Sequence, residues 1–127
     1  MNNIRRDLAT ALKEVLPKAW EIHANGIVPD NPLKPVIIIK QSTITRTPQA
    51  PRLYRDITFT VSLVEPGLAP DKVEDALDVD VDILIDALED INFPGLIWQE
   101  AQRVVFNNER FHGYDITATI TTEKDTP

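Results

Sequence analysis

Apolar residues recur at steps of three and four in two stretches of the chain, and this spacing predicts two amphipathic helices. The first helix is expected over residues 3–16, where Pro17 ends the pattern. The second is expected over residues 70–91, before the helix-breaking residues Pro94 and Gly95. The apolar positions are Ile4, Leu8, Ala11, Leu12, Val15 and Leu16 in the first helix, and Val73, Leu77, Leu84, Leu88 and Ile91 in the second.

Other stretches alternate apolar and polar residues or are rich in β-branched residues, which predicts strands. Four strands are expected over residues 36–45, 57–63, 103–106 and 111–122, and the pattern also allows a short strand over residues 20–23. The element order is therefore α-β-β-α-β-β. Strands that alternate in this way have one buried and one solvated face, so we expect a mostly antiparallel sheet with both helices packed on one face. The predicted fold class is a two-layer α+β sandwich.

The length of the chain and its lack of cysteine narrow the class of protein. At 127 residues it is expected to form a single domain, 1–127, with frayed termini at 1–2 and 123–127. Without cysteine there can be no disulfide and no thiolate site. The longest apolar run, residues 36–39, is far shorter than the roughly 20 residues of a membrane span. Because residues 1–16 form an amphipathic pattern and not a signal peptide, we expect a protein made in the cytoplasm.

The net charge of −7 is concentrated in one segment. Residues 71–90 hold nine of the twenty acidic residues and one basic residue, so this segment carries −8 and the rest of the chain about +1. The rest of the chain shows no basic stripe that could replace the counterions of a nucleic acid. Specific nucleic-acid binding is therefore not expected.

Two interpretations of the acidic segment can be compared. Counted from Asp78, carboxylates occupy positions 1, 3, 5, 9 and 12 of a calcium-binding EF-hand loop, but the sixth position, which requires glycine, is Ile83. A helix with an acidic face fits better, because the acids recur at helical spacing opposite the apolar positions. These acids are Asp71, Asp75, Asp78, Asp82, Asp86 and Glu89. The face could be simply solvated, or it could serve a basic partner or repel a polyanion.

Asp80 departs from this pattern, because it falls between Leu77 and Leu84 on the apolar face. A buried carboxylate needs a partner or must remain protonated. Arg103 or another arginine is the expected partner, so Asp80 and Arg103 are our candidates for a buried charge pair.

Candidate catalytic groups are few, and we do not expect an enzyme. His23 and His112 are far apart in sequence, and Ser42 and Ser62 lie within strands, without the turn of a nucleophile elbow. Four glycines leave no phosphate-binding loop, and two histidines are too few for a transition-metal site. We therefore expect no cofactor, no metal and no catalytic residue.

The segment RTPQAPR, residues 46–52, carries two prolines and, with Arg55, three arginines and no acid. It could be an ordinary exposed hairpin tip whose prolines block edge aggregation. Alternatively it could be an assembly arm whose arginines grip carboxylates of a neighbouring subunit or a partner protein. The assembly interface would then comprise Arg46, Arg52, Arg55, Asp75, Asp78, Asp82, Asp86 and Glu89.

The element order, the length and the closing segment RVVFNNERFHGYDITATI, residues 103–120, resemble the tail terminator proteins of long-tailed bacteriophages. The family's last hairpin ends in a Gly-Tyr-Asp-Ile strand with alternating threonines, which matches residues 113–117. Its second helix follows a Pro-Gly stop, here Pro66-Gly67. The resemblance covers nearly the whole chain.

The resemblance implies a structural virion protein without catalytic residues. Such proteins form a ring, here expected to be a homohexamer, that caps the tail tube and ends its polymerisation. The implied partners are the major tail tube protein and the head–tail connector, with DNA only as passing cargo and no membrane. The implied location is the head-proximal end of the virion tail, after assembly in the host cytoplasm. Another neck protein of the same virion and a non-phage cytoplasmic binding module are the alternatives.

Overall fold

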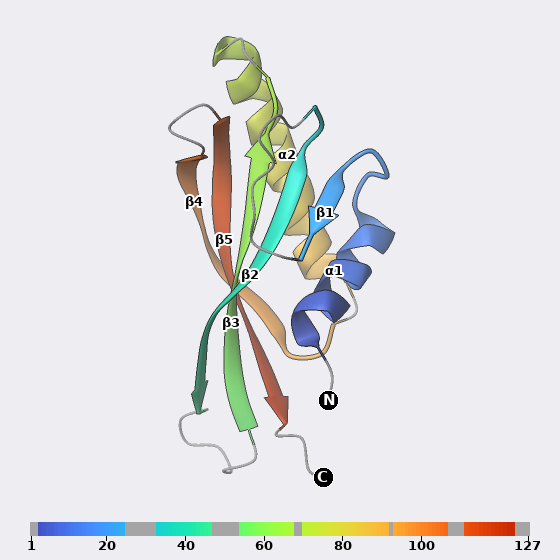
Figure 1. Ribbon diagram of the computed structural model, residues 1–127, viewed down its shortest axis with the longest axis vertical. Coiled ribbons are helices and arrows are strands. Elements are labelled where there is room, and N and C mark those ends of the chain that lie inside the picture. Colours follow the sequence, from blue (N-terminus) through green and yellow to red (C-terminus); the bar gives the residue numbers. More distant parts are fainter. Residues whose placement is uncertain are drawn as a thin grey trace.

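The chain folds into two helices and one five-stranded sheet in the computed structural model, which describes residues 3–24, 33–46, 54–67, 70–91, 93–106 and 111–123 (Figure 1). The predicted two-layer α+β sandwich is confirmed. The elements are α1 (Ile4–Val15), β1 (Glu21–His23), β2 (Val36–Arg46), β3 (Tyr54–Glu65), α2 (Pro70–Asp90), β4 (Leu96–Phe106) and β5 (Phe111–Glu123). The short strand that the sequence allowed after the first helix is therefore present as β1.

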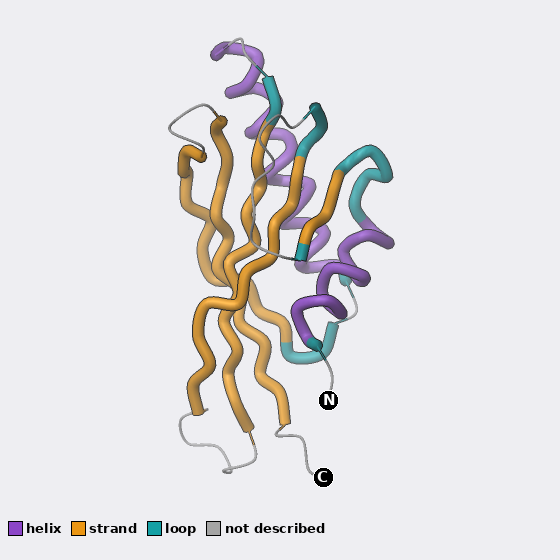
Figure 2. Tube along the Cα trace, viewed as in Figure 1, coloured by secondary structure: helices purple, strands orange, loops and turns teal. Residues whose placement is uncertain are grey.

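The strands lie in the order β1-β2-β3-β5-β4, so β1 and β4 form the two edges of the sheet. β1 runs parallel to β2, and all other neighbouring strands are antiparallel. Figure 2 shows the strong twist of the sheet, with the far ends of β2, β3 and β5 extending past the helices. In this extension the Ile44 side chain is 54% exposed although it lies opposite the buried Ile57.

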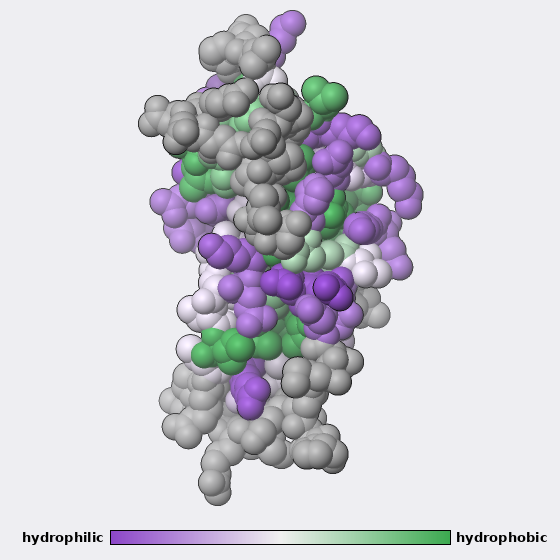
Figure 3. All heavy atoms as spheres, in the orientation of Figure 1, coloured by the Kyte–Doolittle hydropathy of each residue, from purple (hydrophilic) through white to green (hydrophobic). Residues whose placement is uncertain are grey.

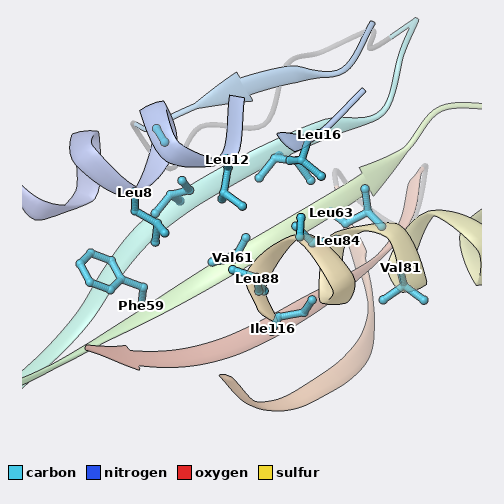
Figure 4. Close-up of a cluster of buried hydrophobic side chains, with 14 of the residues drawn as sticks. Leu8, Leu12, Leu16, Phe59, Val61, Leu63, Val81, Leu84, Leu88 and Ile116 are labelled. Carbon is cyan, nitrogen blue, oxygen red and sulfur yellow. The ribbon is translucent and has the colours of Figure 1, made fainter. Parts of the chain in front are cut away.

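Both helices pack on the same face of the sheet, and their apolar stripes form the main core (Figure 4). α1 lies over β1 and β2, whereas α2 lies over β3, β5 and β4. Figure 4 shows the α1 and α2 side chains directed toward Phe59, Val61 and Leu63 of β3. The residues at this contact are Leu8 and Leu12 of α1 with its C-cap Leu16, and Val81, Leu84 and Leu88 of α2. The predicted helix faces are thus the buried ones, except at Val15, which is 47% exposed at the end of α1.

Local signals fix the ends of the helices. The side chain of Asn3 accepts a hydrogen bond from the backbone N–H of Arg6 at 3.1 Å, which caps α1, and Pro17 follows the last turn. After α2, Gly95 adopts a φ of +79°, a conformation that residues with a Cβ rarely adopt. The Gly95 carbonyl then accepts a hydrogen bond from the Thr121 N–H at 3.3 Å, which starts the β4–β5 pairing.

The face of the sheet away from the helices was predicted to be solvated, but one end of it is not. Val36, Ile38, Val64 and Phe111 are buried there, and Phe106 packs against them. Gly113 makes this possible, because a Cβ at that position would collide with the Leu63 carbonyl oxygen and lie 2.6 Å from the Phe106 ring. The glycine thus accommodates an aromatic side chain on the sheet.

Two β-bulges interrupt the pairing. One falls between Gln41 and Thr43 of β2, and the other between Trp98 and Glu100 of β4. The second explains why the sequence pattern defined β4 best over residues 103–106, whereas the strand begins at Leu96. An extra residue reverses the alternation of faces along the strand, so the first half of β4 does not match a simple two-residue period.

Candidate interaction surfaces

The acidic residues of α2 form a continuous exposed face. The helix is unbroken from Pro70 to Asp90, with Leu77, Leu84 and Leu88 buried against the sheet. The exposed acids on the opposite face are Asp75, Asp78, Asp82, Asp86 and Glu89. The helical interpretation is therefore correct, and the carboxylates lie along a rod instead of converging in a loop. The side chain of Asp71 is outside the described set.

The carboxyl group of Asp80 meets a second carboxyl group instead of an arginine. Asp80 is half-buried on α2, and its side chain is within hydrogen-bonding reach of Glu65, the last residue of β3. The Glu65 residue is only 5% exposed, and its Oε2 atom has no hydrogen-bond partner among the described residues. The expected Asp80–Arg103 pair is therefore wrong, because Asp80 faces the end of β3 rather than β4.

This environment favours a proton on Glu65. Burial raises the pKa of the Glu65 carboxyl to about 8, and the hydrogen bond to Asp80 and the charge of Asp80 act in the same direction. A protonated Glu65 can donate to an Asp80 carboxylate, which removes the repulsion between two anions. His112 lies directly opposite Glu65 in the β3–β5 register.

Arg103 is paired with another acid of α2. Its Nη1 and Nη2 atoms donate to the two carboxylate oxygens of Glu74 at 3.0 and 2.6 Å. This fork-shaped contact joins β4 to the first half of α2 and lowers the pKa of Glu74. Helical spacing could have indicated Glu74, because it lies three positions before the buried Leu77 and four before the exposed Asp78, at the border between the apolar and acidic faces.

The three arginines of the predicted assembly arm are only partly described. The backbone register places Arg46 of β2 opposite Arg55 of β3, and the Arg55 side chain is exposed. Arg52 and the rest of the RTPQAPR segment after Arg46 lie outside the described residues. The structure therefore brings two of the three positions together at the end of the β2–β3 pair.

A ladder of hydrogen-bonded hydroxyl and carboxyl groups crosses the face of the sheet away from the helices, which was not predicted. Between β3 and β5, Ser62 donates to Asp115 at 2.6 Å and Thr121 donates to Asp56 at 2.7 Å. The Thr58 and Thr119 hydroxyls are 3.2 Å apart, and the Ser42 and Thr60 hydroxyls are 2.8 Å apart. The alternating threonines were a signal, but only the register shows which of them face one another.

Figure 3 shows the surface in the orientation of Figure 1, with hydrophilic residues across the middle of the sheet and over α1 and β1. Among the described side chains that the strand register places on the helix-free face, Lys40 is the one lysine or arginine, against the acids Glu21, Asp56, Glu100 and Asp115. This face therefore offers hydroxyls that are bonded to one another and a small excess of negative charge.

Within the described part of the chain, no three metal-ligating side chains are grouped so that they could hold a metal ion. His23 is 3.4 Å from Glu21, its neighbour along β1, and is far in the sheet order from His112 of β5. None of the described helices is long and apolar enough to cross a membrane.

Comparison with known proteins gives no assignment: no protein-family model matches the chain, and no curated protein sequence matches it significantly.

Proposed function

We propose that this protein is a structural subunit of the tail-terminator type, which assembles into a ring on a phage tail tube, stops tube growth and joins the tail to the head. The observation that carries the proposal is the asymmetry of the sheet. Both helices cover one face, while the other presents the hydroxyl ladder with four acids and one lysine. Such a face can line a passage without retaining DNA.

The physical basis is the weak attraction between this face and phosphate. Protein affinity for DNA comes largely from lysine and arginine side chains that displace counterions. The Ser62 and Thr121 hydroxyls already donate their hydrogens to Asp115 and Asp56, so they have none left to donate to a phosphate. Asp56 and Asp115 add repulsion. DNA would then be cargo that passes and not a bound ligand.

The element order and the closing hairpin also agree with the resemblance to terminator proteins. β4 and β5 form the last hairpin, and Gly113, Tyr114 and Asp115 of the matched motif lie in β5. In this motif Gly113 has a packing role beneath Phe106, while Asp115 belongs to the hydroxyl ladder. No catalytic role is part of the proposal.

The test is a tube-capping assay. Purified protein is added to growing tail tubes, and tube lengths and end-bound rings are measured by electron microscopy. A terminator stops elongation and forms rings at tube ends, whereas a neck protein of another kind binds isolated head connectors and leaves tube growth unchanged. A protein that stays monomeric alone and with tubes, and binds neither tubes nor connectors, is a non-phage binding module.

A further inference from the structure

Two regions of the molecule carry opposite charge. α1, β1, β2 and the described residues beside them hold seven basic and three acidic residues, a net charge of +4. α2 and β4, residues 70–91 and 93–106, hold two basic and ten acidic residues, a net charge of −8. Nine of these ten acids lie on α2, which packs over β3, β5 and β4 and also contacts α1.

We name these regions the basic edge and the acidic edge. The basic edge comprises α1, β1 and β2, and its exposed bases include Arg6, Lys13 and Lys40. The acidic edge comprises α2 and β4, with the exposed acids Asp78, Asp82 and Asp86 of the α2 face. β1 ends at His23, opposite Ile38, so no described strand pairs with the outer side of β2 from Lys40 onward. Both edges are thus accessible.

The two regions form no salt bridge with each other in the part of the chain that the structure describes. The salt bridges there are Arg103–Glu74, within the acidic edge, and His23–Glu21, within β1. The exposed acids of α2 and the exposed bases of α1 and β2 are therefore available to a neighbouring molecule.

We propose that copies of this chain associate side by side, with the acidic edge of one copy against the basic edge of the next. Contact between two acidic edges would place −8 against −8, so the self-complementary dimer through α2 is disfavoured. Unlike edges attract, and a contact between unlike surfaces repeats around a ring. The proposal rests on the ring of the proposed function and assigns its subunit interface, which includes the outer face of α1 and not only the arginine segment.

The test uses charge reversal on each edge. The acidic-edge variant carries Asp75→Lys, Asp78→Lys, Asp82→Lys, Asp86→Lys and Glu89→Lys, and the basic-edge variant carries Arg6→Glu, Lys13→Glu and Lys40→Glu. All eight side chains are exposed, so neither variant disturbs the core. Oligomer mass is measured by sedimentation velocity for the wild type, each variant and their equimolar mixture.

We expect the wild type to form oligomers that dissociate as salt is raised, and each variant alone to remain at the monomer mass of 14.3 kDa. The equimolar mixture should assemble again, because one variant then has two basic edges and the other two acidic edges. This recovery also shows that both variants are folded.

Three results would overturn the edge-to-edge contact: a wild type that is monomeric at every concentration and on tail tubes, variants that associate like the wild type, or a mixture that does not recover. Unchanged association of the variants would point to pairing through strand backbones instead. The tube-capping assay separates this outcome from failure of the proposed function, because oligomers that obey the charge rules but ignore tubes would keep the interface and reject the terminator role.

Discussion

The carboxyl groups of Glu65 and Asp80 lie within hydrogen-bonding reach of each other where the end of β3 meets α2. Two acids can share this position if one of them keeps its proton, and the more deeply buried Glu65 is the one that does. The pair therefore makes the stability of the fold depend on pH.

Stability should fall as pH rises through the neutral range. The pKa of Glu65 is about 8 in the folded protein and about 4.5 in the unfolded chain, so the folded state binds the extra proton between these values. The proton on Glu65 makes its full contribution to the free energy of unfolding below pH 4.5. This contribution is lost as pH rises to about 8, by up to about 1.4 kcal/mol for each pH unit. Glu65→Gln should flatten the dependence of the free energy of unfolding on pH, measured by urea denaturation from pH 5 to 9. Glu89→Gln, at an exposed acid, is the matched control, and equal slopes for Glu65→Gln and wild type would contradict the assignment.

Asp80→Asn should narrow the pH range over which the protein loses stability. Asp80 raises the pKa of Glu65 through its hydrogen bond and its charge, so a neutral amide lowers that pKa toward the unfolded value. Relative to the wild type, the variant should gain stability at pH 9 compared with pH 5, with Asp82→Asn as the exposed control. The expected effect comes from the Glu65–Asp80 acid pair and not from the Asp80–Arg103 ion pair that the sequence suggested. A variant whose loss of stability is the same at both pH values would mean that the two carboxyls do not interact.

Gly113→Ala should destabilise the protein by roughly 1–3 kcal/mol or more, because the added methyl overpacks a closed space. It would meet the Leu63 carbonyl and the Phe106 ring. The double variant with Phe106→Ala should recover part of the loss, since the ring is one of the two obstacles. Thr117→Ala on the same strand is the control. Thermal unfolding of Gly113→Ala at the wild-type midpoint would show that the backbone can shift to accept the methyl group.

Calcium should not bind tightly to residues 75–90. A calcium site needs six to eight oxygens that converge on one ion, whereas the exposed acids of α2 are distributed along a helix. Calorimetric titration should reveal no site in the micromolar range or tighter, with a chelator-treated sample as reference. Heat of binding that saturates at one ion per chain would require the helix to unwind there.

The variant Arg46→Ser/Arg52→Ser/Arg55→Ser should leave the monomer folded but impair ring formation and tube capping. Arg46 and Arg55 supply basic charge where β2 ends and β3 begins, and such rim charges steer association more than they hold it. Thr43→Ser/Thr45→Ser changes exposed residues of the same strand without altering charge and serves as the control. Normal capping by the arginine variant at physiological salt would leave the segment as an ordinary hairpin tip.

The elements with a clear period were predictable from sequence. The spacing of Leu77, Leu84 and Leu88 correctly gave the buried face of α2, and the alternation from Ile57 to Leu63 gave the centre of β3. These signals are local, because each residue's face follows from its own position along a regular element. The first half of β4 was missed because the bulge at Gln99 breaks that regularity.

The partners of polar groups could not be predicted, because they depend on register and on contacts distant in sequence. In the sequence Glu65 only precedes the Pro66-Gly67 stop, yet it is the group that meets Asp80. The choice of Glu74 for Arg103 likewise depends on where α2 crosses β4. The threonine ladder required knowing that Thr58 lies opposite Thr119.

The two bulges fall on β2 and β4, the strands whose outer sides no other described strand fully covers. An extra residue bends the strand and shifts its row of N–H and C=O groups out of the even spacing that another strand would need. In a misfolded or crowded population, a strand of another molecule therefore cannot pair over a long, straight stretch on either side of the sheet. Ser42 and Gln99, the extra residues at the two bulges, therefore protect the sheet against edge-to-edge association.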